Sequence, residues 1–223
     1  LTSYDIKSSI LAMPEHVQSI NPYTGLQIAK YETFSPSQVE NCLAQSAAAY
    51  ASYRTASLDE RKKLLLALAN SFTKNRESLS QLAVAEMGKT ITAARGEIDK
   101  CALTARTISE NLEITLQDRK VAGSNGTKFV RPLPLGPVLA IMPWNFPYWQ
   151  ALRAAIPAIA CGNTMLLKHS SNVSGCALAI EKLFLEAGFK TGVFQTVLLD
   201  SSRVTQIIRN PRVKGITLTG SDS

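Results

Sequence analysis

Apolar residues recur at helical spacing through most of the first half of the chain, after an extended lead-in. The lead-in contains the run 21–25, Asn-Pro-Tyr-Thr-Gly, whose residues favour turns. Ser35 or Ser37 can cap a helix that runs to about Tyr53, because a serine hydroxyl accepts from the free amides of a first helical turn. The pattern therefore predicts an extended segment followed by a helix.

Two further amphipathic helices follow this one. Ser57 and Glu60 form a capping-box pattern at the start of the second helix, and Gly88 is typical of a helix end. A third helix is predicted over residues 90–112. We expect all three helices to pack together in a helical part that covers residues 1–113. The apolar stripes consist of Leu64, Leu65, Leu68 and Phe72, and of Ala93, Ile98, Leu103 and Ile108.

Residues 114–135 have a different pattern, in which apolar and polar residues alternate. The run 123–126, Gly-Ser-Asn-Gly, favours a turn between two strand-like segments, 116–121 and 127–133. A polar hairpin that stands off a helical layer is suited to contact between subunits. We therefore expect residues 114–135 to form a protruding arm.

From residue 136 onward, short apolar runs alternate with helical patterns. Strands joined through helices form right-handed crossovers, which give a parallel sheet covered on both faces. The sequence thus predicts an α/β fold of the nucleotide-binding type for residues 136–223. The predicted strands are 138–142, 164–167, 193–197 and 215–218, and the predicted helices are 148–159, 174–187 and 203–208.

Two prolines surround Asn145, directly after the first strand of this sheet. Pro143 and Pro147 fix their own φ at about −65° and disfavour helix in the residues before them, so residues 144–146 should form a rigid elbow. A fixed carboxamide NH2 beyond the carboxyl end of a strand can stabilise a developing oxyanion by about 3 kcal/mol. The alternative is that Asn145 caps the helix that follows.

Polar residues also follow two other strands of the predicted sheet. Lys168-His169-Ser170-Ser171 comes after the second strand, and Thr219-Gly220-Ser221 comes after the last. Parallel strands end at one edge of a sheet, where ligands of such folds bind. We therefore expect these residues and Asn145 to share one binding or catalytic site, in which His169 orients the turn after Lys168.

Composition narrows the class of protein. The content of 45% hydrophobic and 18% charged residues is typical of a soluble globular protein. No apolar run reaches the roughly 18 residues that cross a membrane, and the N-terminus has no signal-peptide core, which predicts a cytoplasmic protein without membrane contacts. The net charge of +7 does not indicate nucleic-acid binding, because acids interrupt most basic runs and the basic stretch 190–214 has one aromatic residue. That stretch favours either a phosphate-bearing ligand or solubility.

Cysteine and histidine usage excludes several chemistries. The chain has four widely spaced cysteines without a C-x-x-C pair, so we expect reduced thiols. With two histidines it offers no Cys/His cluster for zinc, and no metal site is predicted. The patterns G-x-x-x-x-G-K-[ST] and G-x-G-x-x-G are absent, which excludes a P-loop and the ordinary dinucleotide fingerprint.

Several separate motifs, in one order, resemble those of the NAD(P)-dependent aldehyde dehydrogenase superfamily. The resemblance covers nearly the whole chain and implies an incomplete form of that fold, in which a Rossmann-like sheet with helices on both faces follows a helical layer and a hairpin. Trp149-Gln150 and Lys168-His169 are most similar to the bacterial succinate-semialdehyde dehydrogenase branch. The matching motifs are 21–25, Glu86-Met87-Gly88-Lys89 with Glu97, 143–147, 162–164, Lys168, Gly188 with 192–194, and 219–221.

The resemblance implies a mechanism. In the family, a cysteine thiolate attacks the aldehyde, the thiohemiacetal passes a hydride to the nicotinamide, and a glutamate activates the water that releases the acid. Asn145 matches the asparagine that donates to the substrate oxygen, and Lys168 matches the lysine that contacts the adenosine ribose. The other expected cofactor-binding residues are Ile141, Met142, Pro143 and Trp144 at the first strand end, His169, Ser170 and Ser171 after Lys168, and Gly220 and Ser221 beneath the pyrophosphate.

Ser171 bears on the choice of cofactor. Many NAD-dependent relatives carry a glutamate at this position, which accepts from the ribose hydroxyls and repels a 2′-phosphate, whereas a serine hydroxyl does not repel it. We therefore expect the enzyme to accept NADP+ as well as NAD+. The alternative is that Ser171 only caps the helix that starts at Ser174.

The chain ends at Ser223, before the positions of the family's catalytic glutamate and cysteine. Because none of its own cysteines matches the nucleophile, we expect the chain to be the N-terminal part of an enzyme and to be inactive alone. The whole enzyme is expected to oxidise a small aldehyde, succinic semialdehyde in this branch, as a homodimer or homotetramer. The alternative is a non-catalytic nucleotide-binding or structural protein of the same fold.

Overall fold

The computed structural model describes residues 16–123 and 128–221 and contains the expected parallel sheet. Its strands are β5 (Pro137–Met142), β6 (Thr164–His169), β7 (Phe194–Thr196) and β8 (Gly215–Leu218). Their spatial order is β7-β6-β5-β8. In register, Ile141 of β5 lies opposite Lys168 of β6 and Leu218 of β8. The carboxyl ends of three strands therefore lie together.

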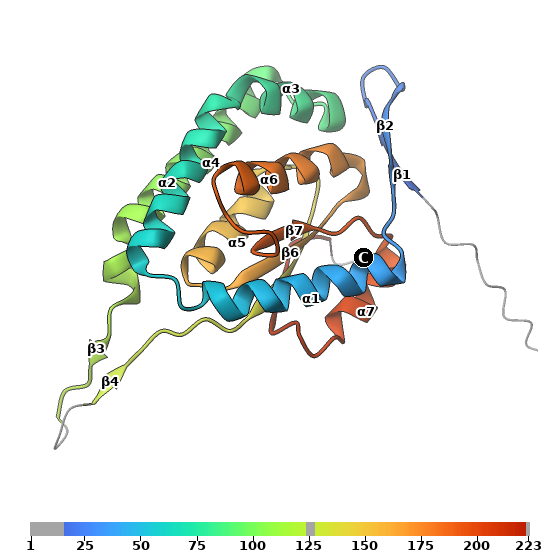
Figure 1. The fold of residues 1–223 in the computed structure, drawn as a ribbon. Coiled ribbons are helices and arrows are strands. Elements are labelled where there is room, and N and C mark those ends of the chain that lie inside the picture. The colour runs from blue at the N-terminus through green and yellow to red at the C-terminus, as the bar shows by residue number, and fades with distance from the viewer. Residues whose placement is uncertain (1–15, 124–127, 222–223) are drawn as a thin grey trace, which may run out of the picture.

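Helices cover both faces of this sheet, as predicted (Figure 1). One face is covered by α5 (Trp149–Ala160) and α6 (Ser174–Glu186), and the other by α1 (Pro36–Tyr53) and α7 (Val204–Ile208). Successive strand residues point to opposite faces. Ala140 and Leu167 accordingly belong to the larger core beneath α5 and α6, whereas Leu139 and Leu166 belong to the smaller core beneath α1 and α7.

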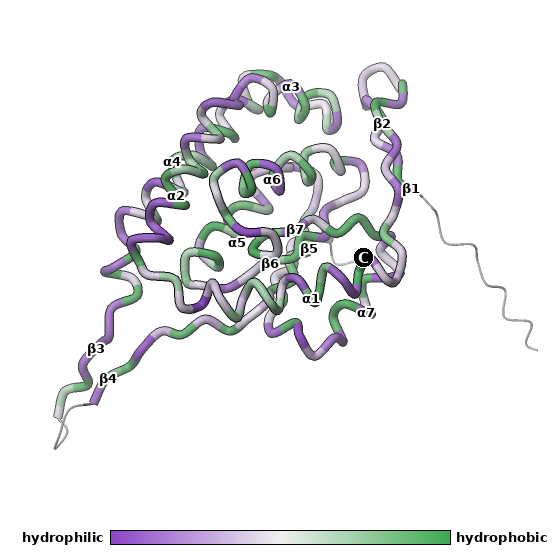
Figure 2. The backbone as a smooth tube through the Cα atoms, viewed as in Figure 1, coloured by the Kyte–Doolittle hydropathy of each residue, from purple (hydrophilic) through white to green (hydrophobic). Residues whose placement is uncertain are grey.

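The other long helices form an outer layer against α5 and α6 (Figure 1). They are α2 (Leu58–Lys74), α3 (Arg76–Met87) and α4 (Ile91–Leu116). α4 packs against α2, α3 and α5. Green and purple segments alternate along α2 and α4 in Figure 2, because each helix has one apolar side.

α1 does not join this outer layer, so the expectation that all three predicted helices pack together was wrong for the first of them. Its Val39 and Leu43 lie in the smaller core on the opposite face of the sheet. The Ser46 hydroxyl also donates to Thr164 Oγ1 at 2.9 Å, which ties α1 to the start of β6. The apolar stripe of α1 does not reveal which face of the sheet it covers.

The predicted capping residues Ser35 and Ser57 begin their helices as expected, and Thr90, which was not predicted as a cap, begins α4 in the same way. Ser35, Ser57 and Thr90 each accept a hydrogen bond from the backbone amide three residues later. Gly88 follows α3 with a φ of 79°, which glycine adopts without a steric penalty. The break between α2 and α3 at Asn75 was not predicted. There the side-chain amide bonds back to the last turn of α2.

Two antiparallel hairpins precede and follow the helical layer. The first pairs β1 (His16–Ile20) with β2 (Gln27–Glu32), so the lead-in forms a hairpin and not one extended segment. The second pairs β3 (Arg119–Lys120) with β4 (Phe129–Val130) and extends away from the body (Figure 1). Its strands are shorter than predicted, because α4 continues to Leu116. Most of its predicted turn lies outside the described residues.

Candidate active site

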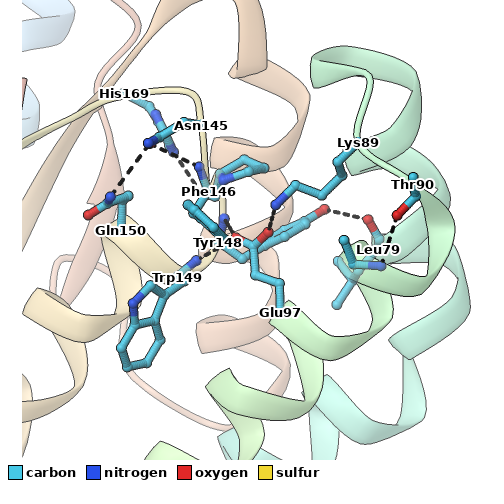
Figure 3. Close-up of polar contacts among 12 residues, drawn as sticks. Leu79, Lys89, Thr90, Glu97, Asn145, Phe146, Tyr148, Trp149, Gln150 and His169 are labelled. Carbon is cyan, nitrogen blue, oxygen red and sulfur yellow. Dashed lines mark hydrogen bonds and ion pairs between the residues drawn. The ribbon is translucent and has the colours of Figure 1, made fainter.

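The elbow between β5 and α5 holds the Asn145 side chain at the carboxyl end of the sheet. Residues 144–148 form bends and turns, and Asn145 is exposed. Its Oδ1 accepts from the backbone amide of Phe146 at 3.1 Å and from Gln150 Nε2 at 3.5 Å (Figure 3). No described residue accepts a hydrogen bond from its NH2 group. These hydrogens are therefore available to a ligand oxygen.

Asn145 does not cap α5, so the alternative interpretation of this residue was wrong. The N-cap residue of α5 is Tyr148, and its side chain makes no capping hydrogen bond. The buried Glu97 of α4 does so instead, because its Oε1 accepts from the backbone amides of Tyr148 and Trp149, both at 2.8 Å (Figure 3). A carboxylate at this end of a helix satisfies free amides and interacts favourably with the helix dipole.

A cavity of about 620 Å³ lies at the carboxyl ends of β5, β6 and β8. Asn145, Lys168 and Gly220 all line it, although they are far apart in the sequence. Its volume falls in the range of about 300–1,000 Å³ that is typical of pockets for small molecules and cofactors. The residues around it are Ile141, Met142, Pro143, Trp144, Asn145, Gln150, Lys168, Ser170, Ser201, Leu218, Thr219, Gly220 and Ser221.

Lys168 is the only charged side chain of the described residues that lines this cavity. It belongs to β6, whereas the sequence placed it after the strand. Partial burial lowers the pKa of its ammonium group, and the nearby Asp200 carboxylate opposes that change. An ammonium group has three donors and no acceptor, so it suits a ligand with hydroxyl, ribose or phosphate oxygens.

His169 and Ser171 do not line the cavity. The buried His169 accepts from the Ser170 amide at Nδ1, so its Nε2–H donates to the Pro147 carbonyl oxygen at 2.7 Å. Burial lowers its pKa to about 4, and the ring is neutral at pH 7. His169 thus holds the turn after Lys168 and ties it to the elbow. Ser171 is exposed and its side chain does not cap α6.

The segment after β8 contributes Thr219, Gly220 and Ser221 to the same cavity. The Thr219 amide donates to the Ile141 carbonyl oxygen at 3.0 Å, which continues the β5–β8 pairing. The Thr219 hydroxyl accepts from Arg153 Nη2 at 2.7 Å, and Arg153 Nε donates to Gln150 Oε1 at 2.8 Å. Arg153 therefore links the first turns of α5 to this segment.

The match to a known protein family extends over nearly the whole chain. A family model described as "Aldehyde dehydrogenase family" matches residues 11–223. This chain belongs to the aldehyde dehydrogenase family. The fold agrees, since solved aldehyde dehydrogenase structures superpose on it with high similarity.

Two curated relatives are similar over 92% of the chain. Succinate-semialdehyde dehydrogenase [NADP(+)] 1 of Mycobacterium tuberculosis (strain ATCC 25618 / H37Rv) is 40% identical over 211 residues, which cover 46% of that protein. Succinate semialdehyde dehydrogenase [NAD(P)+] Sad of Escherichia coli (strain K12) is 37% identical over 206 residues, which cover 45% of it. The chain thus spans about half the length of the curated relatives it matches.

One solved structure shows the likeness in three dimensions. Succinic semialdehyde dehydrogenase from Streptococcus pyogenes, in complex with NADP+, is 32% identical and has a TM-score of 0.89. The match covers 92% of this chain and 45% of that one. The predicted fold is therefore confirmed: this chain has part of the aldehyde dehydrogenase fold.

No cysteine of this aldehyde dehydrogenase chain lines the cavity among the described residues. Cys101 and Cys176 are buried, and Cys42 and Cys161 are partly buried. Burial raises the pKa of all four thiols, which disfavours the reactive thiolate. None of them has the surroundings of a nucleophile.

Three residues at or beside the cavity were not predicted as site residues: Gln150, Arg153 and Ser201. Gln150 and Arg153 lie one turn apart on α5, so the helical period could have revealed Arg153 once Gln150 was placed. Ser201 follows the end of β7, and the same strand-end rule that selected Lys168 could have selected it.

The described residues contain neither a membrane-spanning helix nor a cluster of metal ligands. No helix among them combines the length and the apolar character that a bilayer span requires. In the same part of the chain, no group of three or more His, Cys, Asp or Glu side chains is arranged to hold a metal ion.

Proposed function

We propose that this chain is the dinucleotide-binding part of an NAD(P)-dependent aldehyde dehydrogenase and that it presents Asn145 to the oxygen of the aldehyde. One observation carries this proposal: Asn145, Lys168 and the segment that contains Gly220 surround a single cavity at the carboxyl ends of parallel strands. Such an edge is where α/β sheets bind nucleotides.

The residues present fit a nicotinamide dinucleotide. Ile141 to Trp144 form a wall of mostly apolar side chains for the cofactor, and Lys168 supplies donors for ribose or phosphate oxygens. Gly220 is exposed, and a Cβ there would meet no atom within 4 Å, so the chain is open to a ligand at this point. When bound, the dinucleotide accepts the hydride that leaves the substrate carbon.

The role proposed for Asn145 is electrostatic. Attack on an aldehyde carbon turns the carbonyl oxygen into an oxyanion, and the free NH2 of Asn145 can donate to it. The cysteine thiolate that attacks and the glutamate that activates water belong to the rest of the enzyme in this proposal. The raised thiol pKa values support this division, since they disfavour a nucleophile within these residues.

Succinic semialdehyde is the substrate that we propose, which requires a partner for its carboxylate. Relatives named for this substrate support the choice. Arg153 is exposed beside Gln150, which itself contacts Asn145. Two of the five guanidinium donors of Arg153 bond Gln150 and Thr219, so others are free to pair with a carboxylate.

NADP+ is the cofactor that we propose the enzyme accepts, together with NAD+. Ser170 and Ser171, which follow Lys168, are neutral and would not repel a 2′-phosphate. The names of the two curated relatives include NADP(+) and NAD(P)+. We further propose a homo-oligomer in which the β3–β4 arm contacts another subunit, since its Phe129 and Val130 are about half exposed.

Binding of NADP+ to the 223-residue chain tests the cofactor site directly. We expect measurable binding by isothermal titration calorimetry. Lys168→Met should raise the dissociation constant about tenfold to a hundredfold, because the cofactor loses a hydrogen bond from a charged donor. Lys182→Met is the matched control, because Lys182 is exposed on α6 and pairs with Glu186 away from the cavity. A folded chain that binds neither NADP+ nor NAD+ would contradict the proposal.

Turnover separates the enzyme from its alternative, a non-catalytic protein of the same fold. The 223-residue chain with succinic semialdehyde and NADP+ should form no NADPH, because nucleophile and base are missing from it. The full-length enzyme should form NADPH, whereas a non-catalytic protein would not. Robust NADPH formation by the 223 residues alone would overturn the proposed division of the site.

A further inference from the structure

The elbow that carries Asn145 is held from outside the sheet by the side chain of Glu97. This residue lies on α4, and its side chain is about 1% exposed. Its Oε1 accepts from the amides of Tyr148 and Trp149, both at 2.8 Å. These amides come three and four residues after Asn145, so the carboxylate fixes the end of the elbow where α5 begins (Figure 3).

Lys89 adds a second contact to the same elbow. It lies between α3 and α4, and its ammonium group pairs with Glu97 Oε2. The same group lies 4.3 Å from the centre of the Phe146 ring, an arrangement that attracts a cation to an aromatic face. Lys89 and Glu97 together therefore contact Phe146, Tyr148 and Trp149, three of the four residues that follow Asn145.

The stability of the fold does not by itself explain a buried ion pair at this position. The Lys89 and Glu97 side chains are about 8% and 1% exposed. A buried ion pair contributes little net stability compared with apolar residues of similar size, because both charges lose their hydration. Its main physical effect is directional, since each charge is satisfied in one geometry only. A directional contact next to Asn145 points to a positioning role.

We propose that the buried Lys89–Glu97 pair is a positioning device that sets the orientation of the Asn145 amide. Glu97 fixes the backbone after the elbow, and Lys89 fixes the ring of Phe146, so the amide is held without a direct contact to either residue. The catalytic consequence rests on the proposed function, because it requires that Asn145 donates to the substrate oxygen. The structural claim does not depend on it.

Glu86 provides a matched control within the same chain. Its carboxylate caps α6, where it accepts from the amides of Gly175 at 2.9 Å and Cys176 at 2.8 Å. Both residues are buried, with about 1% of Glu86 and 4% of Glu97 exposed. The helix that Glu86 caps does not follow the elbow. Glu86→Gln should therefore destabilise the fold much as Glu97→Gln does, without acting on Asn145.

Nuclear magnetic resonance of the 223-residue chain tests the structural claim. The side-chain NH2 signals of Asn145 are assigned by their loss in Asn145→Ala. We expect Glu97→Gln and Lys89→Met to shift or broaden these signals, Lys89→Arg to keep them near their original position, and Glu86→Gln to leave them unchanged. Thermal unfolding, followed in parallel, should show a lower midpoint for both glutamate variants. Unchanged Asn145 signals in Glu97→Gln, or equal changes in Glu86→Gln, would overturn the proposal.

Steady-state kinetics of the full-length enzyme tests whether the Lys89–Glu97 pair affects catalysis through Asn145. Misplacing the amide by about 1 Å should lower kcat by about tenfold to a hundredfold in Glu97→Gln, while KM for NADP+ changes less than about twofold. Glu86→Gln should keep kcat within about threefold. If Asn145→Ala itself leaves kcat unchanged, the proposed role of Asn145 has failed. If Asn145→Ala lowers kcat and Glu97→Gln does not, the positioning role has failed.

Discussion

His169 Nε2 donates to the carbonyl oxygen of Pro147 at 2.7 Å, so the end of β6 is tied to the elbow that holds Asn145. The ring must be oriented by its other nitrogen, which accepts from the Ser170 amide at 2.9 Å. The bond between His169 and Pro147 therefore connects two strand ends of the cavity and depends on a neutral imidazole.

The stability of the fold should fall as the pH drops below about 6.5, with His169 as one cause. Burial lowers the pKa of this ring to about 4 in the folded chain, so between pH 6.5 and pH 4 the unfolded chain binds a proton that the folded chain does not. The contribution is complete above pH 6.5, and about 2 kcal/mol is lost by pH 5. Urea unfolding at pH 7 and at pH 5 measures this loss of stability.

Two histidine variants test this assignment. His169→Asn should be less stable at pH 7 but should lose less stability between pH 7 and pH 5 than the unchanged chain. His16→Asn, on the first hairpin, should keep the original dependence on pH. Equal pH dependence of the unchanged chain and His169→Asn would show that His169 is not the responsible group.

Ser171→Glu should shift the cofactor preference of the full-length enzyme from NADP+ toward NAD+. A carboxylate at this exposed position adds a negative charge near the 2′-phosphate of NADP+, and the repulsion should lower kcat/KM for NADP+ about tenfold. Ser171→Gln, which adds length without charge, is the control. A preference that is the same for both variants would exclude Ser171 as the discriminating position.

Arg153→Gln should lower kcat/KM for succinic semialdehyde about tenfold, because the carboxylate loses its paired donors. For butanal, which has the same chain length without the carboxylate, kcat/KM should change less than about twofold. The comparison of the two aldehydes serves as the internal control, since loss of the Arg153 bonds to Gln150 and Thr219 would affect both. Equal losses would assign Arg153 a structural role only.

Gly192→Ala should destabilise the fold by at least about 2 kcal/mol. Gly192 has a φ of +92°, and a Cβ there would lie 2.5 Å from the backbone oxygen of Gln45 on α1. Gly96→Ala is the matched control, because Gly96 is exposed within α4 and a Cβ there meets no atom within 4 Å. It should stabilise the chain by up to about 1 kcal/mol. Chemical unfolding of both variants measures the difference.

The sheet and its polar edge could be predicted from the sequence because their signals are local. The apolar runs before Asn145 and Thr219 have the length of buried strands, and helical segments between such runs imply parallel pairing. Once the strands are parallel, the residues after them must meet at one edge. Asn145 and Lys168 accordingly line the same cavity.

The contacts that depend on packing between distant elements could not be predicted in this way. Glu97 lies on the third predicted helix, and nothing in the spacing of that helix reveals that its carboxylate caps α5, 52 residues along the chain. The β1–β2 hairpin was missed for a related reason. Only one residue of its two strands, Ser19, is buried, so the strands lack the apolar alternation that marks a strand with one buried face.

The register of β5 restricts how this protein can change in evolution or in the laboratory. Leu139 faces the core beneath α1, and Ala140 faces the core beneath α5. Deletion of one residue within the strand would turn the side chains on one side of the deletion to the opposite face of the sheet, so that large and small residues would lie in the wrong core. The same deletion would draw the elbow back by one residue and separate the amides of Tyr148 and Trp149 from Glu97 on α4. Libraries of length variants should therefore spare Pro137–Met142 and place insertions in the exposed turn at residues 22–25.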